Sequence, residues 1–192
     1  MVKKRCGTGG LNVLLCVSGG IAAYKAVDLA SKLTAAGANV QTVMSEAATK
    51  LVGPKSFEAI TGSAVYTSLW ESQAKYETGH IGLVDWADII VVSPATADII
   101  GKAANGICDD LLSTVLCACW HKPTLIAPAM NVNMWKNPAV QSNVEVLKKM
   151  GFELVGPAKG RLACGTVAEG RMSEPAEILQ VIEQLALKIG KK

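Results

Sequence analysis

The chain has 192 residues, of which 50% are hydrophobic and 18% are charged, and its formal net charge is +3 at pH 7. The mean hydropathy of +0.30 is high for a soluble monomer. It indicates that part of the surface is buried by self-association, since soluble monomers rarely expose large apolar patches. Lysine and arginine are scattered, which argues against a nucleic-acid partner. No run approaches the roughly 20 apolar residues of a membrane span.

One domain covering residues 1–192 is expected, because no linker-like stretch divides the chain. The basic Lys3–Arg5 and the apolar Leu11–Val17 only loosely resemble a secretory signal, and a first buried strand is the preferred interpretation. The six cysteines lack metal-ligand spacing apart from Cys117-x-Cys119, so no metal site is predicted. They are typical of cytosolic thiols, which favours a cytoplasmic location.

Apolar runs of strand length alternate with helical patterns along the chain. Strands are predicted at 11–17, 39–44, 88–92, 124–127 and 152–155. Helices are predicted at 21–36, from 46, and at 55–60, 99–104, 109–120, 138–150 and 174–189, whereas 64–84 and the glycine-rich 160–172 lack a regular pattern. This alternation predicts a doubly wound, Rossmann-like α/β fold in three layers, with a parallel sheet of about six strands.

Polar residues follow three of these strands. Ser18-Gly19-Gly20 opens the first helix, where glycine allows close backbone approach and the helix N-terminus attracts anions. Ser45, and Thr96 with Asp98, follow two other strands and are expected to face the same crevice. A mononucleotide site is therefore favoured over a tight turn without a ligand. The absence of G-x-G-x-x-G argues against a dinucleotide.

The loop Pro128–Trp135 follows another strand, where ligands bind in open α/β sheets. Met130 and Met134 fit either core packing or a site wall. Asn131 is interpreted as a buried amide, and the natural partner of such an amide at a strand end is a ligand carboxylate.

His80 and Cys164 are the candidate proton donors and acceptors. His80 follows Gly79 in an irregular stretch that suits a catalytic loop, although a surface histidine is the simpler interpretation of that residue alone. His121 is better explained as a cation at a helix C-terminus. Cys164 lies in the glycine-rich segment, and either a reactive thiol on a lid or a thiol without a function fits that position.

Five short runs, taken together, resemble the homo-oligomeric flavin-containing cysteine decarboxylases, and they cover most of the chain. The loop Pro128–Trp135 fits that family's P-x-M-N-x-x-M-W pattern in full. The five runs are Ser18–Lys25, Gly79–Ile81, Pro94–Asp98, Pro128–Trp135 and Leu162–Gly165.

The resemblance implies an FMN-dependent carboxy-lyase with His80 as the base, Asn131 as the ligand of the substrate carboxylate and Cys164 as the thiol that completes the reduction. The implied substrate-covering flap contacts come from Arg161, Ala163 and Met172. The implied FMN contacts are Gly19, Gly20, Ser45, Thr96, Ala97, Asp98, Ile99 and Ala129.

Cys164 favours the branch of the family that serves coenzyme A biosynthesis. That branch converts the small molecule 4′-phosphopantothenoylcysteine into 4′-phosphopantetheine through thioaldehyde and enethiolate intermediates. The resemblance also implies FMN bound between the subunits of a trimer, trimers assembled into a dodecamer, and a phosphopantothenate–cysteine ligase, either fused or separate.

Three residues depart from the family pattern: Asp98 replaces asparagine, and Thr166 and Ala168 replace aspartate and glycine. Three other functions stay open. Peptidyl-cysteine decarboxylases stop at the enethiol and lack the reducing cysteine, and flavin prenyltransferases lack the Asn131 and Cys164 motifs. A non-catalytic regulatory subunit of a phosphatase typically carries long acidic extensions, which this sequence does not have.

Overall fold

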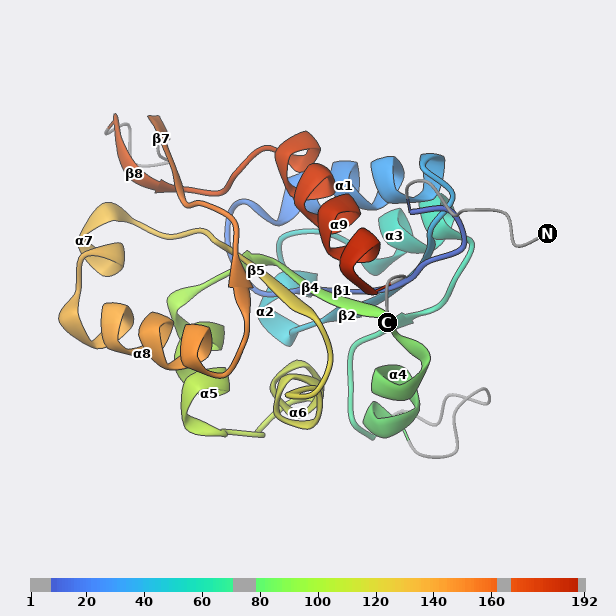
Figure 1. The fold of residues 1–192 in the computed structure, drawn as a ribbon, viewed down its shortest axis with the longest axis horizontal. Coiled ribbons are helices and arrows are strands. Elements are labelled where there is room, and N and C mark those ends of the chain that lie inside the picture. The colour runs from blue at the N-terminus through green and yellow to red at the C-terminus, as the bar shows by residue number, and fades with distance from the viewer. Residues whose placement is uncertain (1–7, 71–78, 162–166, 190–192) are drawn as a thin grey trace.

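The computed structural model describes residues 8–70, 79–161 and 167–189, and a six-stranded parallel sheet forms its centre (Figure 1). The strands are β1 (Asn12–Val17), β2 (Asn39–Met44), β3 (Val65–Tyr66), β4 (Ile89–Ala95), β5 (Thr124–Pro128) and β6 (Glu153–Leu154). Their order is β3-β2-β1-β4-β5-β6, so the chain winds outward in both directions from β1 and β4. The predicted doubly wound α/β fold is confirmed.

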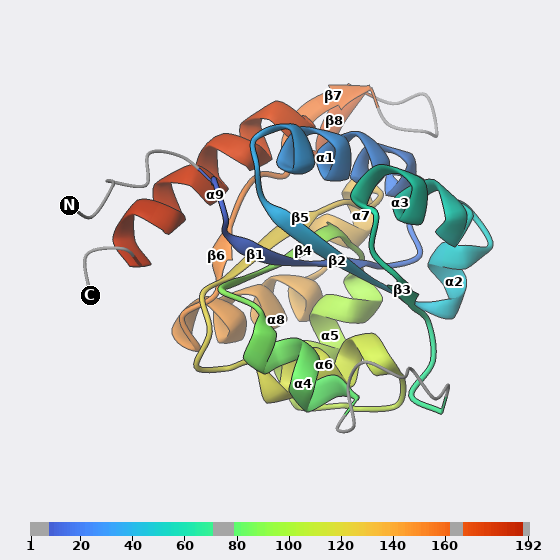
Figure 2. The same ribbon diagram turned by 90° about the vertical axis from the view of Figure 1, so that its right-hand side faces the viewer.

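Helices cover both faces of the sheet (Figure 2). The helices of the described residues are α1 (Ala23–Ala35), α2 (Glu46–Thr49), α3 (Pro54–Thr61), α4 (His80–Trp86), α5 (Ala97–Asn105), α6 (Leu111–Ala118), α7 (Val132–Trp135), α8 (Pro138–Lys149) and α9 (Pro175–Ile189). α1, α3 and α9 pack on one face, and α4, α5, α6 and α8 pack on the other. None of these helices has the length and apolar character needed to span a bilayer.

The central strand β1 shows why the apolar runs are continuous. Val13 and Leu15 point into the core beneath α1 and α9, whereas Leu14 and Cys16 point into the core beneath α5 and α6. All four side chains are fully buried. A strand covered on both faces needs apolar residues at every position, which is the pattern that the sequence shows.

The prediction of a glycine-rich loop at 160–172 is wrong for most of the residues that the structure describes there. They form a two-stranded antiparallel hairpin of β7 (Ala158–Arg161) and β8 (Val167–Arg171), separate from the main sheet. The hairpin is attached to the β5–α7 connection, because the Met130 N–H donates to the Gly170 carbonyl at 2.9 Å. The position of the hairpin therefore depends on distant backbone, which leaves no periodic signal in the strands themselves.

The expectation of an irregular segment at 64–84 is also wrong at both ends. β3 extends the sheet beside β2, and His80 is the first residue of α4 rather than part of a loop. The helix has seven residues and includes Gly82, so its sequence carries little helical pattern. It is stabilised by tertiary packing, since Leu83 and Val84 are buried in the core.

Candidate active site

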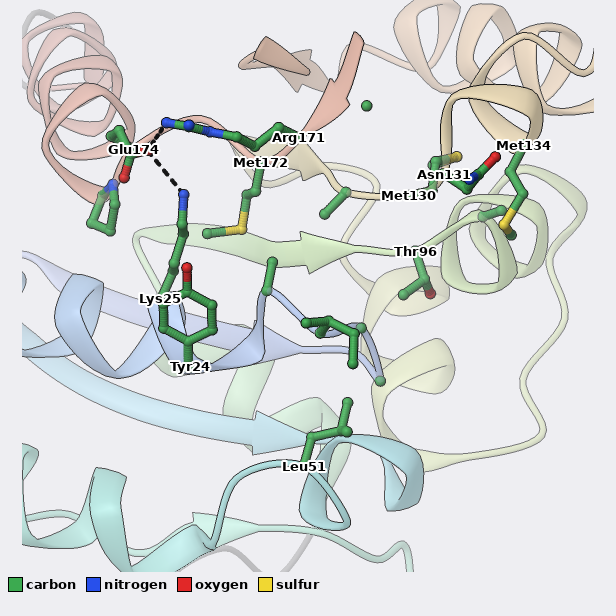
Figure 3. A pocket seen from close by; sticks show the side chains of 18 of the residues that line it. Tyr24, Lys25, Leu51, Thr96, Met130, Asn131, Met134, Arg171, Met172 and Glu174 are labelled. Atoms are coloured by element: carbon green, nitrogen blue, oxygen red, sulfur yellow. Dashed lines mark hydrogen bonds and ion pairs between the residues drawn. The ribbon is translucent and has the colours of Figure 1, made fainter. Parts of the chain in front are cut away.

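A cavity of about 1120 Å³ is lined by the connections that follow β1, β4, β5 and β8 (Figure 3). β1 and β4 are neighbours from which the chain continues in opposite directions. Ligands of open α/β sheets bind at such a switch point. The volume is slightly above the usual range for small-molecule pockets, which is about 300–1,000 Å³. The position and size of this cavity make it the candidate active site.

The turn after β1 forms a closely packed backbone cradle. A Cβ atom at Gly19 would lie 2.3 Å from the Ala47 Cβ, and one at Gly20 would lie 3.2 Å from the Thr96 Cγ2. Neither position therefore has free space for a larger side chain. α1 begins directly after this turn without a side-chain cap and without an acidic residue in its first turn. The dipole of this helix N-terminus favours an anionic ligand group.

The turn after β4 is attached to the turn after β1 through Ser18. The buried Ser18 hydroxyl donates to the Pro94 carbonyl at 2.8 Å and accepts from the Thr96 N–H at 3.1 Å. Thr96 in turn caps α5, because its side chain accepts from the Ile99 N–H. Two helix N-termini are thus held at adjacent positions beside the cavity.

The loop after β5 contributes Ala129, Met130, Asn131 and Met134 to the cavity wall. Asn131 caps the short helix α7, its Oδ1 accepting from the Asn133 N–H at 2.8 Å. The interpretation of Asn131 as a buried amide is wrong, since the residue is exposed on the cavity wall. Met134 is also half exposed there, so this methionine is not core filler.

β8 and the segment after it form the remaining wall. Gly170 has φ = +134°, and a Cβ there would lie 2.4 Å from the Met130 carbonyl oxygen, so only glycine fits this close approach. Met172 is 1% exposed, and its sulfur accepts from the Ser93 hydroxyl at 3.3 Å. The hairpin is therefore joined directly to the end of β4.

The structure brings together seven of the site residues that the sequence predicts, although it holds no ligand that would test their roles. All seven lie along one cavity wall or another, despite coming from four separate connections. They are Gly19, Gly20, Thr96, Ala97, Ala129, Asn131 and Met172.

Four other predicted residues lie within the described part of the chain and do not line this cavity. Ser45 caps α2, accepting from the Ala48 N–H at 3.2 Å. Asp98 is exposed and lies 3.4 Å from the Lys102 Nζ, whereas Ile99 is buried in the core. His80 is half-buried on α4, on the opposite face of the sheet from α1.

For three predicted residues the structure describes no side chain. Ala163 and Cys164 lie outside the described residues, and Arg161 is described only as the last residue of β7. Their predicted roles therefore stay predictions.

Charged residues of the wall were not singled out from the sequence. Lys25, Arg171 and Glu174 all line the cavity. Lys25 is a member of the run Ser18–Lys25 that contributes to the family resemblance, so its charge was an available signal. Arg171 lies outside the five runs. Glu174 carries no comparable signal, because its place in the site depends on how the chain passes from β8 to α9.

The cavity fits a flavin mononucleotide. The Gly19–Gly20 turn and the N-termini of α1 and α5 can hold a phosphate through backbone N–H groups. Ile21, Tyr24 and Met134 add exposed apolar side chains that a flat aromatic ring system would cover. Donor groups and apolar wall are thus both present for this cofactor.

Proteins similar to this chain include bifunctional ones. Coenzyme A biosynthesis bifunctional protein CoaBC of Bacillus subtilis (strain 168) is 51% identical over 173 residues, which are 90% of this chain and 42% of that protein. The protein of the same name from Escherichia coli (strain K12) is 42% identical over 172 residues, which are 90% of this chain and 42% of that protein. The chain therefore spans less than half the length of these curated relatives.

Solved structures match the chain over nearly its whole length. A mutant PPC decarboxylase complexed with pantothenoylaminoethenethiol has a TM-score of 0.82 and 32% identity, covering 92% of this chain and 98% of its own. The FMN-binding protein AtHal3 has a TM-score of 0.78 and 33% identity, covering 91% of this chain and 96% of its own. The model of the family described as Flavoprotein matches residues 3–187. The chain belongs to the Flavoprotein family.

Proposed function

We propose that this chain is an FMN-dependent carboxy-lyase that converts 4′-phosphopantothenoylcysteine into 4′-phosphopantetheine for coenzyme A biosynthesis. The observation that carries the proposal is the likeness to the mutant PPC decarboxylase, because this chain covers 98% of that protein at 32% identity. The relatives named CoaBC support the same pathway. Their greater length supports a phosphopantothenate–cysteine ligase as a fused or separate partner, and we propose the cytoplasm as the location.

Asn131 is the proposed ligand of the substrate carboxylate. Its Oδ1 accepts from the Asn133 N–H in capping α7. A side-chain amide also carries N–H groups, which are the kind of donor that a carboxylate accepts from. FMN, when bound, supplies reversible oxidation at the carbon that carries sulfur, which creates the electron sink that loss of CO₂ requires. Asn131 would hold the carboxylate in place while the bond to it breaks.

His80 is the proposed base, and a second copy of the chain would supply it. Within one chain, α4 packs on the face of the sheet opposite α1, and His80 is not among the residues that line the cavity. A trimer in which each cavity receives His80 from its neighbour would reconcile this placement with the role, and a dodecamer of such trimers is the proposed full assembly. Cys164 would donate the final proton to the product.

The proposal is tested by measuring CO₂ release from 4′-phosphopantothenoylcysteine by the flavin-loaded protein. Asn131→Asp keeps the oxygen that caps α7 but replaces the amide donor with a negative charge, so we expect CO₂ release to fall at least a hundredfold, which is about 3 kcal/mol. Asn133→Asp is the matched control, because Asn133 lies two residues further on in α7, is exposed and does not line the cavity. It should retain near wild-type activity.

Two outcomes would contradict the proposal. A wild-type protein that carries no flavin absorbance through gel filtration cannot be an FMN enzyme of this kind. A flavin-loaded protein that releases CO₂ from a C-terminal peptidyl cysteine but not from 4′-phosphopantothenoylcysteine would belong instead to the peptide-modifying branch.

A further inference from the structure

One side of the cavity carries a three-residue charge cluster, which consists of Lys25, Arg171 and Glu174 (Figure 3). Lys25 comes from α1, Arg171 ends β8, and Glu174 precedes α9. The Lys25 Nζ lies 3.0 Å from the Glu174 Oε1, and the Arg171 Nη2 contacts the same oxygen. Two cations from distant parts of the chain therefore share one carboxylate oxygen beside the cavity.

The charge cluster holds a surplus of positive charge. The hydrogen bond from Lys25 is the main cause that lowers the pKa of Glu174, and the nearby charges of Lys25 and Arg171 lower it further. The carboxylate therefore stays ionised at neutral pH. Asp28 is the other acidic residue of the cavity wall, and its carboxylate is engaged by Lys32 at 2.9 Å. Two cations are thus balanced by one carboxylate.

The guanidinium of Arg171 is positioned but not saturated. A Cβ at Gly160 would lie 2.9 Å from the Arg171 Cδ and 3.1 Å from its Nη1, so glycine at that position of β7 leaves room for the arginine side chain. The Arg171 Nε is buried and has no hydrogen-bond acceptor among the described residues. The Arg171 side chain as a whole is 38% exposed, so other parts of it stay accessible to an incoming oxyanion.

This charge cluster is separate from the backbone cradle. Figure 3 shows Lys25 and Glu174 at one side of the cavity, and Thr96, Asn131 and Met134 at the other. The cradle and the N-termini of α1 and α5 already account for a cofactor phosphate. The two cations on the opposite side of the cavity are therefore available to a second anionic group.

We propose that Lys25 and Arg171 bind the phosphate monoester of the substrate, and that Glu174 holds the two cations in position before the substrate arrives. The inference rests on the proposed function. The substrate has two anionic groups, and Asn131 is assigned to its carboxylate, which leaves the phosphate for the charge cluster. Two cations match a phosphate dianion, arginine through paired N–H donors and lysine as a point charge.

The test compares 4′-phosphopantothenoylcysteine with pantothenoylcysteine, which lacks the phosphate, as substrates of the flavin-loaded enzyme. Lys25→Gln and Arg171→Gln should each raise KM for the phosphorylated substrate at least tenfold, about the effect of losing one charged hydrogen bond. The KM for pantothenoylcysteine and both kcat values should change less than about twofold. Lys148→Gln is the matched control, since it removes a lysine that is ion-paired with Glu145 on α8, and neither residue lines the cavity.

Flavin content and thermal midpoint are measured on each variant. Equal increases of KM for both substrates would overturn the inference, and loss of flavin would assign the cations to the cofactor instead. If a variant does not fold, the inference is tested instead by measuring product inhibition of the wild-type enzyme. In that experiment 4′-phosphopantetheine should inhibit at least tenfold more strongly than pantetheine. Equal inhibition by the two products would also overturn it.

The wild-type enzyme distinguishes this inference from the proposed function. If it releases CO₂ from neither substrate, the proposed function fails and the inference fails with it. If it releases CO₂ from both substrates with the same KM, the decarboxylase function stands and only phosphate recognition is refuted.

Discussion

Ser18 shows how one hydroxyl can set the geometry of a cavity wall. It bridges two turns that are 76 residues apart, donating to the Pro94 carbonyl and accepting from the Thr96 N–H. These turns carry the glycines of the cradle and the first turn of α5. Because the bridge is buried, water cannot replace the hydroxyl when it is removed.

Ser18→Ala should therefore lower the free energy of unfolding by about 1–3 kcal/mol, the cost of leaving buried polar groups without partners. Urea denaturation of the flavin-loaded protein measures this value. Ser56→Ala is the control, because Ser56 is exposed on α3, and it should change stability by less than about 0.5 kcal/mol. Equal midpoints for the two variants would show that the bridge contributes nothing.

Two buried thiols make stability depend on alkaline pH. Burial raises the pKa of Cys119 to about 11 from 9.0, and burial likewise raises the pKa of Cys16. Between pH 9 and about pH 11 the folded protein keeps the thiol proton of Cys119, whereas the unfolded chain loses it. Stability should therefore fall as pH rises from about 9 to about 11, by up to about 1.4 kcal/mol per pH unit for each thiol.

Cys119→Ala removes one of the two ionisations and should flatten this decline. Urea midpoints at about pH 8 and about pH 10 are compared, since the difference between the two pH values cancels the constant packing loss of the alanine variant. An unchanged difference would show that Cys119 does not titrate in the unfolded chain over this range.

At the scale of elements, a close contact with the β5–α7 connection helps to position the β7–β8 hairpin. Gly170 lies against the Met130 carbonyl oxygen, and its own carbonyl accepts from the Met130 N–H. The contact places Arg171 and Met172 on the cavity wall. The position of the hairpin thus decides what the site contains on that side.

Gly170→Ala should displace the hairpin, because its Cβ would approach the carbonyl oxygen to 2.4 Å. We expect a lower thermal midpoint and at least a tenfold loss of CO₂ release, about the effect of misplacing one charged binding group. Gly62→Ala shares a positive φ, at +66°, but has no atom within 4 Å of the added Cβ. It should lower the midpoint only slightly and leave activity intact, and an equal loss of activity in both variants would exclude the specific contact.

For the whole molecule, apolar side chains around the cavity mouth support the proposed assembly. Ile21 is 66% exposed and Tyr24 is 61% exposed in one chain. A neighbouring subunit that brings His80 to the cavity would also cover this surface. The high mean hydropathy is consistent with such burial.

Mixed oligomers test whether the site is shared between chains. His80→Asn and Asn131→Asp should each be inactive alone, but their co-expression should restore about a quarter of the wild-type activity, since half of the chains carry each intact group and random cyclic assembly multiplies the two halves. Mixing the separately purified, stable oligomers serves as the control without exchange. Activity that stays absent after co-expression, with mixed oligomers shown by mass, would mean that both residues act within one chain.

Much of the fold follows from local patterns in the sequence. The apolar runs of β1, β4 and β5 and the helical stripes between them indicate a parallel sheet covered on both faces, because each pattern reflects burial of its own segment. Local patterns did not predict the short elements. α4 and the β7–β8 hairpin are stabilised by contacts with distant residues, so their own sequences carry little signal.

The sequence by itself determined the alternation of strands and helices, the glycines of the first turn and the polar residues at the strand ends, since these depend on local backbone geometry. Only the tertiary structure decided which of them meet. Strand order places Thr96 beside Gly20 and leaves His80 on the opposite face. The path from β8 to α9 brings Glu174 to Lys25 across 149 residues. Such pairings depend on packing of whole layers, which no local pattern records.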